Sequence, residues 1–288
     1  NMPASVASVA GLLAEATSRL AAACGLEPRE ARLEARVLAG FAWQCGPAWL
    51  IAHAPDPVSP AQLTAFDQLL QRRIQGEPVA HITGTREFYG RLFHVTRDVL
   101  IPRPETELLV DLALERMPAG SARTVLDLGT GSGCLAITLA LERPNAQVTA
   151  VDRAPAALAI ARGNAARLGA AVAFLESDWF DALAGRRFDI IVGNPPYIAA
   201  ADPHLARGDV RFEPLSALVA GNDALDDLRR LIAAAPRHLA PGGSLLLEHG
   251  YDQAVAVRSL LLAQGFEQVR HWDDLAGIAR VSGGSLSE

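Results

Sequence analysis

The residues of this sequence best suited to chemistry form a tetrapeptide, Asn194-Pro195-Pro196-Tyr197, directly after the apolar run 188–193. Proline has no backbone N–H and a fixed φ angle, so two prolines end a strand and make the turn rigid. The Asn194 side-chain oxygen and the Pro195 carbonyl can each accept one hydrogen of a planar –NH2 group, while the Tyr197 ring covers its face. The motif therefore predicts recognition of an amino or amide nitrogen. Taken alone, it also fits a strand terminator with a packed tyrosine.

A glycine-rich loop joins a predicted strand to a predicted helix, with the sequence Gly129-Thr130-Gly131-Ser132-Gly133. Glycines at such a turn let a ligand approach the backbone closely, beside a helix N-terminus. Cys134 stands where a dinucleotide fingerprint needs its last glycine, so a nicotinamide cofactor is not indicated. The chain contains no lysine and hence no Gly-Lys-Ser/Thr phosphate cradle. The loop favours a nucleoside ligand.

Acidic and aromatic side chains follow the next two predicted strands. Asp152 ends the second strand, about where a carboxylate accepts hydrogen bonds from a ribose. Asp178 and Trp179 follow the third strand and offer an acceptor and an aromatic face to an adenine. Asp127, just before the glycine loop, makes the loop acidic and favours a nucleoside with a cationic tail. S-adenosylmethionine is such a molecule, and S-adenosylhomocysteine is the product of its methyl transfer.

The elements that must position these residues divide the chain into two parts. Apolar residues recur at helical spacing through residues 4–76, with Gly25 at one helix end and Ser59-Pro60 at one helix start. Residues 87–95 predict a β-hairpin. From about residue 107 onwards helices and strands alternate, which predicts an α/β fold with a mostly parallel sheet between helices. Because ligands bind at the carboxyl ends of such strands, the residues named above should meet there.

The composition restricts the class of protein. The 288 residues are enough for two domains, and half of them are hydrophobic. A net charge of −6 without any basic run disfavours a stable nucleic-acid partner. The three cysteines have the spacing of neither a disulfide framework nor a zinc site, and no metal is expected. No apolar window reaches the length of a membrane span, so we expect a cytoplasmic protein without a membrane partner.

Beyond these motifs, the chain resembles the HemK/PrmC family of peptide chain release factor N5-glutamine methyltransferases. The resemblance covers about residues 78–281 and is most distinctive at Ile101–Glu107. It also includes the segments Glu87–Gly90, Val99–Glu107, Phe212–Pro214, Ala220-Gly221, Glu248–Gln253 and Asp274–Gly277. One departure is Ile278–Arg280, where an acidic residue would be expected before the arginine.

The resemblance implies a class I methyltransferase fold, which is Rossmann-like with a reversed C-terminal strand, plus a small N-terminal helical domain. It implies a helical substrate-recognition domain (residues 1–77), a hairpin linker (78–100) and an S-adenosylmethionine-dependent methyltransferase domain (101–288). The implied substrate is the glutamine of the Gly-Gly-Gln loop in class 1 release factors, and its methylation supports translation termination.

The resemblance also assigns roles to single residues. The cofactor would be lined by Gly129, Thr130, Gly131, Ser132, Gly133, Asp152, Trp179 and Asn194. Asp178 joins this set from the adenine argument alone. The glutamine would be held by Asn194, Pro195, Pro196 and Tyr197, with the catalytic roles falling to Asn194, Pro195 and Tyr197.

Two other functions are compatible with these residues. An amino-methyltransferase acting on a nucleic-acid base, of the adenine N6 type, shares the Asn-Pro-Pro-Tyr chemistry with a flipped base in place of the glutamine. A cofactor-binding scaffold without turnover would keep the glycine loop and transfer no methyl group. The acidic charge argues against the first function, and the intact Asn194 argues against the second.

Overall fold

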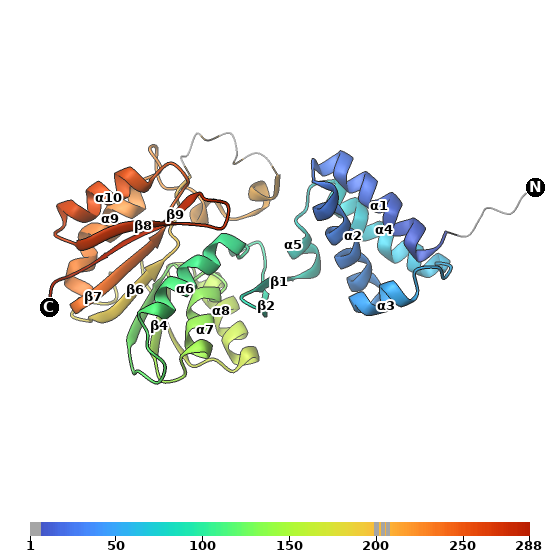
Figure 1. Cartoon of the computed structure of the whole chain (residues 1–288). Coiled ribbons are helices and arrows are strands. Elements are labelled where there is room, and N and C mark those ends of the chain that lie inside the picture. Colours follow the sequence, from blue (N-terminus) through green and yellow to red (C-terminus); the bar gives the residue numbers. More distant parts are fainter. Residues whose placement is uncertain (1–6, 199–201, 203–204, 206–207) are drawn as a thin grey trace, which may run out of the picture. The chain divides into compact units, whose positions relative to one another are not determined.

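The computed structural model of the chain describes residues 7–198, 202, 205 and 208–288. Two compact units are present (Figure 1). The helical unit contains residues 7–84 together with 208–212. The catalytic unit, so named for the site described below, contains residues 85–198 and 213–288. The chain therefore leaves the catalytic unit after its fourth parallel strand, contributes a short segment to the helical unit and returns.

The catalytic unit is built on a seven-stranded sheet with the strand order β5-β4-β3-β6-β7-β9-β8 (Figure 1). Its strands are β3 (Thr124–Leu128), β4 (Gln147–Asp152), β5 (Val172–Glu176), β6 (Phe188–Gly193), β7 (Leu239–Glu248), β8 (Glu267–Asp273) and β9 (Ala279–Ser285). The first five run parallel, whereas β9 is antiparallel to both β7 and β8. The predicted mostly parallel α/β sheet with a reversed C-terminal strand is confirmed.

Helices cover both faces of this sheet. They are α6 (Glu107–Glu115), α7 (Cys134–Glu142), α8 (Pro155–Leu168), α9 (Asp226–Ala234) and α10 (Ala254–Ala263). Successive strand residues point to opposite faces, so Ile190 packs in the core with α6 and α7, and Ile191 in the core with α9 and α10. Burial on both faces explains why β6 reads as a continuous apolar run.

A two-stranded hairpin precedes the sheet in the chain. It consists of β1 (Thr85–Phe88) and β2 (Arg91–His94), joined through the positive-φ residues Tyr89 and Gly90. Phe88 and Phe93 are fully buried in the core that contains α6 and α7. The 3-10 turn η1 (Pro104–Thr106) then leads into α6. The hairpin is thus packed into the catalytic unit.

The helical unit has its own core. Its helices are α1 (Val9–Cys24), α2 (Pro28–Trp43), α3 (Pro47–Ala52), α4 (Pro60–Ile74) and α5 (Val79–Thr83), and the 3-10 helix η3 (Gly208–Phe212) groups with them. Ser59 and Gln62 form the reciprocal capping box at the start of α4. Trp43 packs against Trp49 and Phe66, so these tryptophans anchor the core.

In the described parts of the chain, no single helix is long and apolar enough to cross a membrane. The bent pair α1 and α2 meets the length and composition criteria only when the two helices are taken together. Leu12, Leu20 and Leu38 of this pair are buried in the core of the helical unit.

Candidate active site

A cleft lies at the carboxyl ends of β3, β4 and β6 in the catalytic unit and encloses about 1000 Å³ of empty space, its open mouth included. Of the residues predicted for the site, it is lined by Gly129, Thr130, Gly131, Ser132, Asp152, Asp178, Trp179, Asn194 and Pro196. Gly133, Pro195 and Tyr197 are not among its lining residues. Parallel strands bring their carboxyl ends to one edge, which explains why segments 65 residues apart meet here.

The three loop glycines all have positive φ angles but serve different purposes. A Cβ on Gly129 would lie 3.0 Å from Cζ3 of Trp179, so this glycine lets the indole ring pack on the loop. A Cβ on Gly133 would lie 2.8 Å from Cδ1 of Ile137 and 3.2 Å from Cβ of Ala161 in α8, so this glycine lets the start of α7 pack closely against α8. At Gly131 a Cβ would meet no atom within 4 Å. Gly131 therefore borders the open space in which a ligand would lie.

Asp152 ties the glycine loop to the next strand. Its Oδ2 accepts a hydrogen bond from Gly131 N at 2.9 Å, and its Oδ1 accepts one from Ala154 N at 2.9 Å. Each carboxylate oxygen has a second lone pair, so the group can still accept hydrogen bonds from ribose hydroxyls in the cleft. The side chain is half-buried and fixed before any ligand arrives.

Asp127 lies in β3 beneath the loop and is fully buried. Its Oδ2 accepts a hydrogen bond from the Thr130 hydroxyl at 2.8 Å. Burial raises the pKa of this carboxyl to about 7, so much of its negative charge is lost at neutral pH. Asp127 also does not line the cleft. Asp127 thus shapes the loop through Thr130, and the acidic character that we expected it to give the loop stays a prediction.

Trp179 and Asp178 form the third side of the expected nucleoside site. The Trp179 indole Nε1 donates to Asp227 Oδ1 at 3.1 Å, which holds the ring against Gly129. Asp178 instead makes a two-point ion pair with Arg230, with N···O distances of 3.0 and 3.1 Å. Both of its oxygens already have partners, so an acceptor role for Asp178 toward adenine stays a prediction.

The Asn-Pro-Pro-Tyr segment follows β6, as predicted. The Asn194 Oδ1 atom is buried and has no hydrogen-bond partner among the described residues. Pro195 and Pro196 are buried, and the Tyr197 carbonyl accepts a hydrogen bond from Gln253 Nε2 at 3.3 Å. Burial, together with the nearby charge of Glu248, raises the pKa of the Tyr197 phenol to about 12, so this ring is neutral at physiological pH. A buried acceptor without a donor is costly unless a ligand supplies the donor.

One wall of the cleft was missed by sequence reasoning. It contains Asp98, Val99, Leu100, Pro102, Arg103 and Thr106 on one segment, and Pro214, Ser216 and Ala217 on another. Glu213 joins the two segments, because its Oε2 accepts from Ile101 N at 2.9 Å and its Oε1 pairs with Arg103. The family resemblance included Val99–Glu107 and Phe212–Pro214, but nothing in the local pattern distinguished a wall of the site from a linker.

Comparisons with known proteins agree with this geometry. Residues 11–84 match the PrmC N-terminal domain family, and residues 106–208 match the methyltransferase small domain family. The release factor glutamine methyltransferase of Bordetella pertussis is 53% identical over 261 residues, which cover 90% of this chain and 97% of that protein. Its namesake from Xylella fastidiosa is 48% identical and covers 98% of each chain.

Among solved structures, a Pyrococcus furiosus methyltransferase superposes with a TM-score of 0.54 at 18% identity, covering 77% of this chain and all of that one. At that identity the likeness shows the methyltransferase fold alone. The long alignments at about 50% identity show more. With its PrmC-type N-terminal domain and its methyltransferase domain, the chain belongs to the family of release factor glutamine methyltransferases.

Proposed function

We propose that this chain transfers a methyl group from S-adenosylmethionine to the side-chain amide nitrogen of the glutamine in the Gly-Gly-Gln motif of class 1 release factors. The second product is S-adenosylhomocysteine. Relatives that cover nine-tenths or more of the chain carry the name of this activity. Because release factors act in translation termination, we also propose that the protein is located in the cytoplasm.

The observation that carries this proposal is the unpartnered Asn194 Oδ1 atom. It is buried at the end of β6, and Asn194 lines the same cleft as the glycine loop and Asp152. A buried carbonyl oxygen fits a substrate that brings an N–H donor, as the –NH2 of a glutamine side chain does.

The residues of the cleft fit the proposed cofactor. Gly131 leaves space against the loop backbone, Asp152 can accept from ribose hydroxyls, and Trp179 offers an aromatic face held by Asp227. When bound, the cofactor supplies an electrophilic methyl group on a positively charged sulfur.

The chain's own residues would orient the amide. The lone pair of an amide nitrogen is delocalised into its carbonyl, so the nitrogen is a poor nucleophile without help. Asn194 Oδ1 and the Pro195 carbonyl would each accept one N–H, and Pro196 adds no competing donor because it lacks an N–H. The Tyr197 ring would fix the amide plane. Holding two reactants in line can lower a barrier by up to about 7–11 kcal/mol.

Proton transfer need not come first in this scheme. The nitrogen gains positive character as the methyl group arrives, and its surplus proton then leaves to solvent. The neutral Tyr197 phenol, with its pKa raised to about 12, adds no charge that would compete with the reacting groups. The role of these residues is therefore to orient the amide.

The proposal is tested with labelled S-adenosylmethionine and two macromolecular substrates. The protein is incubated with a class 1 release factor or with duplex DNA, and the label is located by mass spectrometry. We expect one methyl group on the glutamine of the Gly-Gly-Gln motif and none on DNA. Label on a DNA base would support a base methyltransferase, and cofactor binding without any transfer would support a scaffold; either result would contradict the proposal.

A further inference from the structure

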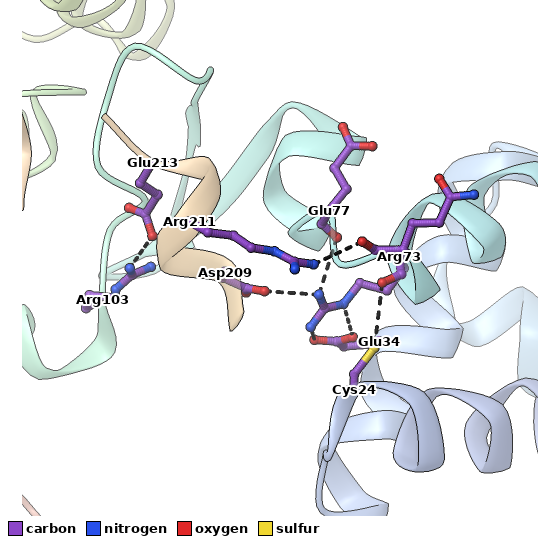
Figure 2. Close-up of polar contacts among 9 residues, drawn as sticks. Cys24, Glu34, Arg73, Glu77, Arg103, Asp209, Arg211 and Glu213 are labelled. Carbon is purple, nitrogen blue, oxygen red and sulfur yellow. Dashed lines mark hydrogen bonds and ion pairs between the residues drawn. The ribbon is translucent and has the colours of Figure 1, made fainter. Parts of the chain in front are cut away.

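The short helix η3 is fastened to the helical unit through the buried side chain of Arg73. Arg73 lies near the end of α4 and is only 5% exposed. Its Nη1 donates to Asp209 Oδ1 of η3 at 3.0 Å and to the Glu77 carbonyl at 3.3 Å. Figure 2 shows the guanidinium of Arg73 between Asp209 on one side and Glu34 on the other. Residues 136 positions apart in the sequence are thereby joined.

Arg73 is held in place independently of Asp209. Its Nε and Nη2 donate to the two oxygens of Glu34 on α2, at 2.7 and 3.2 Å. This two-point pair neutralises the buried arginine within the helical unit itself. Asp209 is therefore an addition to a completed ion pair, and its side chain is 40% exposed. Loss of Asp209 should leave the helical unit folded.

A second contact fastens η3 to the same place. Arg211 Nη2 donates to the Gln75 carbonyl at 3.0 Å, directly after α4. A Cβ on Gly76 would lie only 1.5 Å from that Nη2 atom, so the guanidinium occupies space that only a glycine leaves open. With Arg211 included, two positive and two negative side chains meet here. η3 is therefore held to the end of α4 by two separate contacts, one from Arg73 to Asp209 and one from Arg211 to the Gln75 carbonyl.

The chain returns from η3 directly to the missed wall of the cleft. Phe212 ends η3, and Glu213, whose side chain is fully buried, holds Ile101 and Arg103 in the catalytic unit. The chain on either side of η3 is also joined within the catalytic unit. Ile198, directly after the Asn-Pro-Pro-Tyr segment, donates its N–H to the Leu218 carbonyl at 2.9 Å. The segment that contains η3 therefore begins and ends next to residues that line the cleft.

We propose that the Arg73–Asp209 ion pair is a positioning contact that makes methyl transfer to a protein substrate depend on the helical unit. This inference rests on the proposed function. Only three residues separate Asp209 from Glu213, so a helical unit held by a bound partner can act through η3 on the chain beside the cleft, whereas Glu213 keeps the cleft wall itself in place. Partner binding to the helical unit can then influence how the glutamine is presented to Asn194.

The test compares two substrates and two substitutions. Methylation rates are measured with a full-length release factor and with a short Gly-Gly-Gln peptide that offers no other contact. With Asp209→Asn, we expect kcat on the release factor to fall about tenfold while KM stays within about twofold. On the peptide the variant should match the wild type. Asp209→Glu, which keeps the carboxylate, should restore most of the lost rate.

The matched control is Arg72→Ala. Arg72 lies on the same helix and makes a two-point ion pair with Glu77, but no hydrogen bond or ion pair joins it to η3 among the described residues. This variant should keep wild-type rates on both substrates. An Asp209→Asn variant that matches the wild type on the release factor, or loses rate equally on both substrates, would overturn the inference alone. A wild-type protein that leaves the release factor unmethylated would overturn the proposed function and the inference with it.

Discussion

The two walls of the cleft are built in different ways. The first wall is made of strand ends: the glycine loop after β3, Asp152 at the end of β4 and Asn194 after β6. Each of its residues is placed by the strand that precedes it. The second wall is made of residues 98–106 and 213–217, and a single buried side chain, Glu213, joins them across 112 positions of sequence.

The first wall depends on local chain geometry, whereas the second wall depends on a partner that is distant in sequence. In the first wall, glycines with positive φ and the prolines after β6 set the backbone, so a substitution acts where it is made. In the second wall, the position of Ile101 and Arg103 depends on a residue outside their segment. A substitution there should act at a distance.

The largest effect is expected for Asn194→Ala in the first wall. Loss of the buried acceptor should lower kcat about 100- to 1,000-fold, because the amide would no longer be oriented. Cofactor affinity, measured by calorimetry, should fall far less. Asn222→Ala, at an exposed loop position, is the control and should leave kcat unchanged. Near-normal turnover of the Asn194 variant would show that the oxygen does not hold the substrate.

A pH-dependent effect is expected for Asp127→Asn, beneath the same wall. The folded-state pKa of Asp127 is raised by burial from 3.8 to about 7, so the folded protein holds this proton more tightly than the unfolded chain does. The wild type should lose stability relative to the variant as the pH rises from about 4 to about 7. The difference between the two free energies of unfolding should change by an amount on the order of 3–4 kcal/mol. Denaturant titrations at several pH values measure it, and parallel curves would contradict the raised pKa.

In the second wall, Glu213→Ala should reduce both stability and cofactor affinity. The substitution leaves the buried Ile101 N–H without its acceptor and the partly exposed Arg103 without its ion-pair partner, which should lower the free energy of unfolding by about 2 kcal/mol. We expect cofactor affinity to fall about tenfold as well, since Pro102 and Arg103 lose their anchor. Glu142→Ala removes the half-exposed partner of Arg91 and should change stability by less than about 1 kcal/mol. Unchanged cofactor affinity in the Glu213 variant would mean that the second wall does not act on the ligand.

The smallest effect is expected in the glycine loop. Comparing Gly131→Ala with Gly25→Ala separates backbone strain from the loss of a ligand contact. Gly131 and Gly25 have similar positive φ angles, 55° and 65°, and neither would bring a Cβ within 4 Å of another atom. Alanine at either position should lower the free energy of unfolding by about 1 kcal/mol. Only Gly131→Ala should also weaken cofactor binding, because only its new methyl group enters the cleft. Equal cofactor affinity in the two variants would place the ligand away from the loop.

Much of the architecture could be predicted because its causes are local. Alternating helices and strands, buried apolar runs such as 188–193 and the Ser59-Pro60 helix start all follow from periodicity and backbone chemistry. The first wall was predicted for the same reason, since strand ends in a parallel sheet meet at one edge. The position of Asn194–Tyr197 could be predicted from β6 alone, because the tetrapeptide directly follows this strand.

Other features of the site had no local cause. The charge of Asp127 could not be judged from its place before a glycine loop, because its pKa depends on burial by the rest of the core. Asp178 has the position of an adenine acceptor, but its partner Arg230 lies 52 residues away. Side-chain pairs of this kind depend on tertiary packing, which leaves no periodic signal in the sequence.

The parallel sheet, the edge at which the cleft lies and the rigid turn Asn194–Tyr197 after β6 could all be predicted from the sequence alone. Backbone conformation and hydrophobic periodicity are enough for these, since both act over a few residues. Two other features are visible only in the folded protein: residues 98–106 form a wall of the cleft, and η3 groups with the helical unit. Buried charged groups pair with residues that are near in space, whatever their distance in the sequence. Glu213 and Ile101 are 112 residues apart, and Asp209 and Arg73 are 136 residues apart.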